Sequence, residues 1–122
     1  MTSFPYPSLL AVAQALADGR TTARALVEQA LERINDPQGE GARVFMTVHA
    51  DAARRQADIM DTLRQQGRAP TIAAGLPVSV KDLFDEAGCV SRAGSLVLEN
   101  AAPASMDAPA IRNLTQAGML SM

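Results

Sequence analysis

Lys81 is the residue of this sequence whose type and position favour chemistry most directly. The chain has ten arginines but a single lysine, which follows the apolar run 76–80. Arginine stays charged under nearly all conditions, whereas a lysine amine loses its proton readily once buried. A lysine at the end of a buried strand can therefore act as a base at neutral pH. The alternative is an exposed lysine that pairs with Asp82 on the surface and contributes little.

Three serines lie close to Lys81 in the sequence: Ser79, Ser91 and Ser95. A serine–lysine pair needs a hydroxyl that reaches the amine. Ser79 precedes the lysine by two residues, so both side chains share one face if the segment is a strand. The alternative, which we favour on sequence alone, is a strand serine that satisfies a neighbouring polar group.

Cys89 and His49 are the one cysteine and the one histidine of the chain. A nucleophilic Cys–His site needs the two in contact and a third group that orients the base. They lie on different predicted elements, and no local signature surrounds either. We expect Cys89 to be a buried or partly exposed thiol and His49 to be a surface residue at a strand end. One cysteine and one histidine also argue against a structural zinc site.

Asp82, Asp85 and Glu86 form an acidic cluster directly after the lysine. A calcium site would need more oxygen ligands, arranged around a glycine-containing loop that this sequence lacks. A solvated turn is therefore the interpretation we favour. We expect neither a metal nor a cofactor.

Two helices are predicted at the start of the chain. Ser8 can cap a short helix that ends near Asp18. Thr21 or Thr22 can cap a clearer helix that ends near Asn35, and its apolar residues fall on one face at helical spacing. That face consists of Ala23, Leu26, Val27, Ala30, Leu31 and Ile34.

A β-prone run, 44–48, and a third helix, from about 51 to 66, are expected next. Three helices and a short strand thus come before the lysine segment. The inner face of the third helix is predicted to contain Ala52, Ala53, Ala57, Ile59, Met60 and Leu63.

The second half of the sequence alternates short apolar runs with loops. Residues 76–80 are predicted to form a strand buried on both faces, and the ends of such strands commonly carry catalytic groups. Residues 95–98 read as a short strand or turn. Asp107 is the expected cap of a helix that has Pro109 in its first turn and Gly118 just after its end.

The last residues, 119–122, resemble the opening of a strand in an α/β crossover. Domains seldom end where a strand begins. We therefore expect residues 1–122 to be the N-terminal portion of a single truncated domain. Residues 1–66 would be mainly helical, and residues 73–122 would hold the lysine strand, loops, a helix and the start of the next strand.

Composition and charge exclude several classes of protein. The apolar content of 48% argues against disorder, and the net charge of −2, without a basic stripe, argues against a nucleic-acid partner. No apolar run approaches the roughly 18 to 20 residues of a transmembrane helix, and the N-terminus lacks the pattern of a signal peptide. A cytoplasmic protein is expected, since the lone cysteine also suits a reducing compartment.

The segment Gly75-Leu76-Pro77-Val78-Ser79-Val80-Lys81-Asp82 resembles the lysine-bearing segment of the amidase signature family. The likeness continues through Ala87-Gly88, Arg92-Ala93-Gly94-Ser95 and Asp107-Ala108-Pro109, and it ends at Ala117-Gly118. The order and spacing of these short motifs over residues 74–118 make it specific. Two departures are visible. The family often has Gly-Pro-Leu at 71–73, and its strand after Gly118 runs on into Gly-Lys-Thr-Asn.

The resemblance implies an α/β fold, a mixed sheet covered by helices, of which these residues form the first part. It also implies that Lys81, in its neutral form, accepts a proton through one serine and so activates a second serine to attack an amide carbonyl. The first of these serines follows a cis peptide bond in the family, and a glycine-rich loop supplies the oxyanion donors. Both serines belong to a Gly- and Ser-rich motif that is missing between Lys81 and Met122. Only Lys81 is carried over, so we expect the 122-residue chain alone to be inactive.

The implied activity is hydrolysis of the carboxamide C–N bond of a small, non-peptide amide. An alternative is the A subunit of a glutamyl-tRNA amidotransferase, which would bring partner subunits; a homodimer is also compatible. The contrasting alternative is a non-catalytic remnant or interaction fragment, in which exposed sheet edges promote association.

Overall fold

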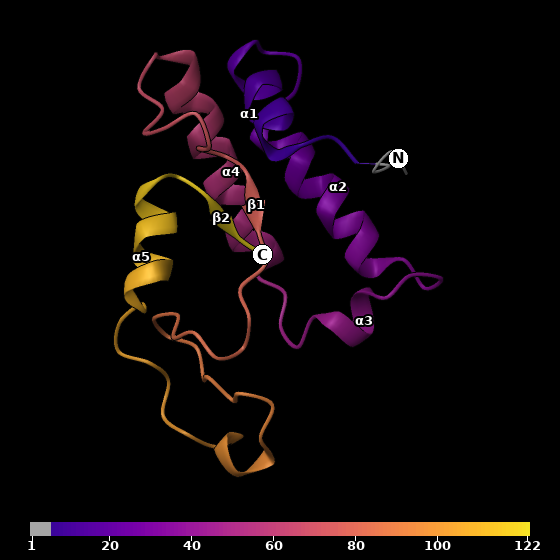
Figure 1. Ribbon diagram of the computed structural model, residues 1–122, viewed down its shortest axis with the longest axis vertical. Coiled ribbons are helices and arrows are strands. Elements are labelled where there is room, and N and C mark those ends of the chain that lie inside the picture. Colours follow the sequence, from indigo (N-terminus) through magenta and orange to yellow (C-terminus); the bar gives the residue numbers. More distant parts are fainter. Residues whose placement is uncertain (1–5) are drawn as a thin grey trace.

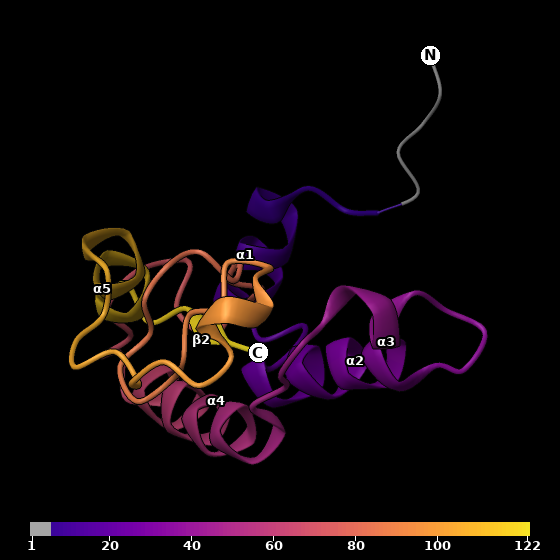
Figure 2. The ribbon, with the colours of Figure 1, turned by 90° about the horizontal axis from the view of Figure 1, so that it is seen from below.

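The computed structural model describes residues 6–122 (Figure 1). In both views, helices α2 (Ala23–Asn35) and α5 (Pro109–Gln116) lie on opposite sides of two short strands (Figures 1 and 2). The predicted α/β class is therefore correct. No helix within residues 6–122 is long and apolar enough to cross a membrane. In chain order the elements are α1 (Leu9–Ala17), α2 (Ala23–Asn35), α3 (Gly41–Val44), α4 (Ala50–Gln65), β1 (Pro77–Val78), the 3₁₀ helix η1 (Leu96–Leu98), α5 (Pro109–Gln116) and β2 (Leu120–Ser121).

Hydroxyl caps start the first two helices, as the sequence predicts. The Ser8 Oγ accepts a hydrogen bond from the Ala11 N–H at 3.1 Å, and Thr22, not Thr21, caps α2 by accepting from the Ala25 N–H at 3.0 Å. Each cap satisfies a backbone donor that the helix itself leaves without a partner.

Helix α4 supplies a second cap for α2. Both carboxylate oxygens of Asp61 accept backbone N–H groups, from Ala23 at 2.7 Å and from Arg24 at 3.0 Å. A negative charge at a helix N-terminus is also favoured by the helix dipole. One side chain of α4 therefore fixes where α2 begins.

The main core lies between α2 and α4. Val27 and Leu31 of α2 are buried, and so are Ala53 and Ala57 of α4, which are one helical turn apart. The predicted inner face of α4 is wrong at Ile59, whose surface is 54% exposed. Ile59 follows Ala57 by two residues, which places it about 200° around the helix from the buried stripe.

An ion-pair network bridges the same two helices. Glu28 of α2 accepts hydrogen bonds from the Arg54 guanidinium of α4, at 2.9 and 3.0 Å, and from Arg24 Nε at 2.7 Å. Arg24 also reaches the Asp58 carboxylate at 2.8 Å. The hydrogen bonds from Arg54 and then from Arg24 lower the pKa of Glu28 to about 2, against an ordinary value of 4.5.

The two strands are parallel neighbours. Pro77 is paired with Leu120, and Val78 with Ser121. The strand predicted at 76–80 is thus shorter than expected, because the ladder spans two residue pairs. The prediction that it is buried on both faces is also wrong, since Pro77 and Val78 are half-buried and Ser79 is exposed. The strand predicted after Gly118 is confirmed as β2, and Leu120 is 2% exposed.

Two glycines, one before each strand, allow neighbouring segments of the chain to pack closely. Gly75 and Gly118 have φ values of +91° and +85°, and the Gly75 N–H donates to the Gly118 carbonyl at 2.8 Å. A Cβ on Gly75 would lie 2.6 Å from the Ala23 Cβ, and a Cβ on Gly118 would lie 2.7 Å from the Ala74 Cβ. Both positions therefore exclude any side chain.

The strand predicted at 44–48 is wrong. Val44 ends α3, and residues 45–49 form a connector without regular structure. Phe45 and Val48 instead pack against the core between α2 and α4. A β-prone composition reflects a fit to a half-buried surface, and here burial is reached without a strand partner.

The expected cap of α5 is also wrong. The Asp107 carboxylate accepts the Ala87 N–H at 2.8 Å, while Ala108 occupies the cap position and Pro109 begins the helix. Proline suits that first position because its missing N–H needs no partner there. The segment 95–98, predicted as a short strand or turn, instead contains the short 3₁₀ helix η1, which Ser95 caps.

Candidate functional site

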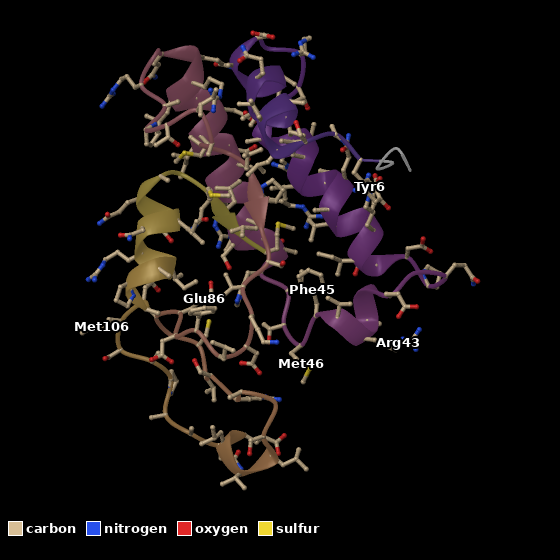
Figure 3. The ribbon with its side chains drawn as sticks, viewed as in Figure 1. Tyr6, Arg43, Phe45, Met46, Glu86 and Met106 are labelled. Carbon is tan, nitrogen blue, oxygen red and sulfur yellow. The ribbon has the colours of Figure 1, made fainter. Side chains whose placement is uncertain are left out.

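A hollow of about 920 Å³ opens on the side of the molecule where β1 ends. Its walls come from the connector after α3, from the segment that follows β1, and from Met122. Phe45 and Met46 of the connector point to opposite sides, and Glu86 lies across from them (Figure 3). The polar or reactive side chains on its walls are Thr47, His49, Ser79, Lys81, Asp82, Glu86, Cys89, Ser91 and Arg92.

Lys81 follows the end of β1 by three residues and is exposed on the wall of this hollow. The chain turns sharply there, since the N–H groups of Leu83 and Phe84 both donate to the Lys81 carbonyl, at 2.7 and 3.1 Å. The alternative surface pair with Asp82 does not form: Lys81 makes no ion pair within residues 6–122, and Asp82 accepts the Arg92 N–H at 3.0 Å. Lys81 therefore lines the hollow without a carboxylate partner among the residues that the structure describes.

The three candidate serines differ in their contacts. Ser79 is exposed on the same wall as Lys81. Ser91 donates its hydroxyl to Asp85 at 2.6 Å, and the Ser95 Oγ accepts from the Val97 N–H at 3.2 Å. Ser91 and Ser95 thus hold the loop together, and Ser79 lines the hollow together with Lys81.

The acidic cluster is more ordered than a solvated turn. Asp82 and Asp85 each accept a hydrogen bond from their own loop, and Glu86 accepts the Ser121 hydroxyl at 2.6 Å. The last bond ties the lysine loop to β2. No group of three or more histidine, cysteine, aspartate and glutamate side chains is placed to hold a metal ion anywhere in residues 6–122.

The structure brings Cys89 and His49 together, against the sequence expectation. The Cys89 Sγ lies 3.8 Å from the His49 Nε2, although 40 residues separate the two. His49 occupies the cap position of α4 and not a strand end, while Cys89 is partly buried, as expected. No sequence signal could have found this contact, because the path of the loop decides it.

The Cys89 thiol is not activated as a nucleophile. Burial raises its pKa, and the nearby charges of Glu86 and Asp107 raise it further. Catalytic cysteines need the opposite, a pKa lowered by positive surroundings. The raised pKa of the thiol therefore argues against a nucleophilic role for the Cys–His contact.

Comparison with known proteins gives one consistent family. The Amidase family model matches residues 25–122. AtzE, the 1-carboxybiuret hydrolase subunit of Pseudomonas sp. (strain ADP), is 36% identical over 107 residues, which are 88% of this chain and 23% of that protein. The A subunit of the glutamyl-tRNA(Gln) amidotransferase of Chloroflexus aurantiacus (strain ATCC 29366) is 36% identical over 118 residues, which are 97% of this chain and 24% of that protein.

Solved structures agree with the sequence comparison. The peptide amidase of Stenotrophomonas maltophilia superimposes with a TM-score of 0.82 at 28% identity, covering 98% of this chain and 25% of that one. The chain therefore spans about a quarter of the length of the relatives it matches.

Proposed function

The chain belongs to the amidase signature family, and from that membership we propose that Lys81 is the proton acceptor in the hydrolysis of a carboxamide C–N bond. The observation that carries this proposal is the position of Lys81. The chain's single lysine lies just beyond β1, unpaired within residues 6–122, on the wall of a hollow large enough for a small amide. Family membership supports hydrolase chemistry; the role of this residue is our inference.

In this proposal the neutral Lys81 amine accepts a proton from one serine hydroxyl, which in turn accepts the proton of a second serine. The second serine oxygen attacks the amide carbonyl. The nitrogen of the substrate takes up a proton and leaves as ammonia or an amine, and water then hydrolyses the resulting acyl-enzyme. Neither serine is assigned within residues 1–122, because no Gly- and Ser-rich motif follows Lys81. Lys81 is the single group of the proposed triad that these residues supply.

A chimaera tests the role of Lys81. Residues 25–122 would replace the matching segment of an amidase-family relative, and ammonia release from a small carboxamide would be measured. Lys81→Ala is expected to lower kcat about 10²- to 10⁴-fold, the usual contribution of a general base. The matched control is Arg112→Ala on α5, an exposed cation, which should leave kcat unchanged. An equal loss of kcat in both variants, or no loss in either, would reject the assignment of Lys81 as the base.

The purified 122-residue chain is expected to release no ammonia from carboxamides, because it lacks the nucleophile of the proposed triad. Turnover by this chain that disappears in Lys81→Ala would contradict the expected inactivity while still supporting Lys81 as the base, and it would point to a serine that lines the hollow, such as Ser79, as the nucleophile.

The A subunit of an amidotransferase is the second candidate function. The relatives support it, since the amidotransferase relative and the hydrolase relative are equally identical to this chain. Both relatives are named as subunits, which makes a partner protein worth testing for. Amide hydrolysis by the full-length protein alone favours the amidase, whereas activity that requires a co-purified partner favours the amidotransferase.

A non-catalytic interaction fragment is the candidate from a different class. Leu96 and Val97 are 85% and 90% exposed, an unusual state for two neighbouring apolar side chains. Concentration-dependent association of the 122-residue chain, lost on Leu96→Ser, would support this role. A monomer with a cooperative thermal transition would argue against it.

A further inference from the structure

Cys89 and His49 form a contact that the proposed amide chemistry does not use. The two are far apart in the sequence, partly buried and on the same hollow as Lys81, and 3.8 Å separates Sγ from Nε2. We propose that this pair is a two-ligand site for a soft monovalent cation of the copper(I) class.

The distance between the two atoms fits a shared ion. Metal–sulfur and metal–nitrogen bonds of about 2.3 and 2.0 Å place two ligand atoms about 4.3 Å apart when they hold an ion in a linear arrangement. The observed separation of 3.8 Å is about 0.5 Å shorter than this distance. A small outward movement of the loop therefore suffices for both atoms to reach one ion.

The surroundings of the pair favour a cation. Burial and then the negative charges of Glu86 and Asp107 raise the pKa of the Cys89 thiol, and Glu86 lies on the same hollow. Negative charge beside a ligand pair attracts a positive ion and offsets part of the cost of removing its water.

The number and type of ligands select the ion. No third histidine, cysteine or acidic side chain joins a ligand group within residues 6–122. Zinc normally takes four ligands, and calcium six or more oxygens, so neither suits a pair. Thiolate and imidazole suit copper(I), which can be held by few ligands. On binding, the thiol releases its proton to solvent and a metal–sulfur bond forms, with no change in oxidation state.

Silver(I) is a suitable air-stable probe of this class, added as the nitrate in chloride-free buffer to the 122-residue chain. The chain has one histidine, so the ring ¹⁵N resonances of His49 report binding without ambiguity. We expect one silver ion per chain, a shift of the Nε2 resonance and loss of reaction of Cys89 with a thiol reagent.

His49→Gln should weaken silver binding about tenfold or more, at least the effect that indirect ligand partners have on metal sites. Met46→Leu is the matched control, because its thioether lies on the same hollow, and it should bind silver as the wild type does. In denaturing urea the wild type and His49→Gln should bind alike, since the pair is then separated.

Three outcomes would overturn the proposal. One is a His49 resonance that does not move when Cys89 becomes protected. The second is equal affinity of the wild type and His49→Gln in native buffer, which would mean that the thiol binds without the histidine. The third is a loss of affinity in Met46→Leu as large as in His49→Gln, which would place the ion elsewhere on the hollow.

Discussion

The α2–α4 helix pair and the loop region from Lys81 to Asp107 are held in place by different forces. Helix α2 alone buries Ala23, Val27, Leu31 and Ile34. Between Lys81 and Asp107, by contrast, not one residue is buried. In Figure 1 this loop region extends away from the helices.

Polar contacts replace packing in the loop region. The carboxylate of Asp107 accepts a hydrogen bond from the Ala87 N–H, and the carboxylate of Glu86 accepts one from the Ser121 hydroxyl of β2. Gly88 and Ala104 add a further backbone link, with the Gly88 N–H donating to the Ala104 carbonyl at 2.9 Å. Segments with little burial open at lower free energy than the packed core. The candidate chemistry thus lies on the more easily opened side, next to a rigid helical support.

The largest expected difference between the two regions comes from removing an apolar side chain. Leu31→Ala should lower the free energy of unfolding by about 2 to 5 kcal/mol, because it leaves a cavity between α2 and α4. Leu96→Ala, at an 85% exposed position, should change it by less than about 0.5 kcal/mol. Urea denaturation followed by circular dichroism measures both. Similar losses of the free energy of unfolding in the two variants would mean that the loop around Leu96 is packed in solution.

Glycines of similar φ offer the next comparison. Gly75→Ala should destabilise by about 2 to 4 kcal/mol, from the left-handed backbone and from contact with Ala23. Gly94 has a φ of +71° but no atom within 4 Å of an added Cβ, so Gly94→Ala should cost only about 1 kcal/mol. Thermal melts compare the two. A loss in Gly94→Ala that matched Gly75→Ala would show that backbone strain, and not the neighbour, decides the effect.

Cutting one polar link tests whether the loop opens separately from the core. Asp107→Ala removes the acceptor of the Ala87 N–H and should cost about 1 kcal/mol locally. Limited proteolysis within residues 87–107 should therefore be about fivefold faster, with the melting temperature nearly unchanged. Glu99→Ala, an exposed acid of the same loop, is the control. A lower melting temperature without faster cleavage would mean that loop and core unfold together.

The smallest effect is expected from Glu28, whose partly exposed network bridges α2 and α4. Its pKa is lowered to about 2 in the folded chain, so its charge stabilises the fold above its ordinary value of 4.5. That contribution is lost as the pH falls from 4.5 towards about 2. Glu28→Gln should therefore melt lower than the wild type at pH 7, and the two should converge near pH 2. A constant difference across this range would show that the charge is not responsible.

The sequence by itself determined helices α1 and α2. Their caps, at Ser8 and at Thr21 or Thr22, and the apolar stripe of α2 depend on residues within one or two turns of each other, so local rules suffice to place them. The motif from Gly75 to Asp82 likewise identified the family and the candidate lysine, since its residues are contiguous.

Tertiary structure decided the features that depend on distant neighbours. The run 44–48 has strand-forming residues but finds a core surface in place of a strand partner, and Asp107 caps no helix because its carboxylate binds the Ala87 N–H instead. The meeting of Cys89 with His49 and the bond from Ser121 to Glu86 each join residues at least 35 positions apart. Such contacts depend on how the whole chain packs, and no local pattern of residue types encodes them.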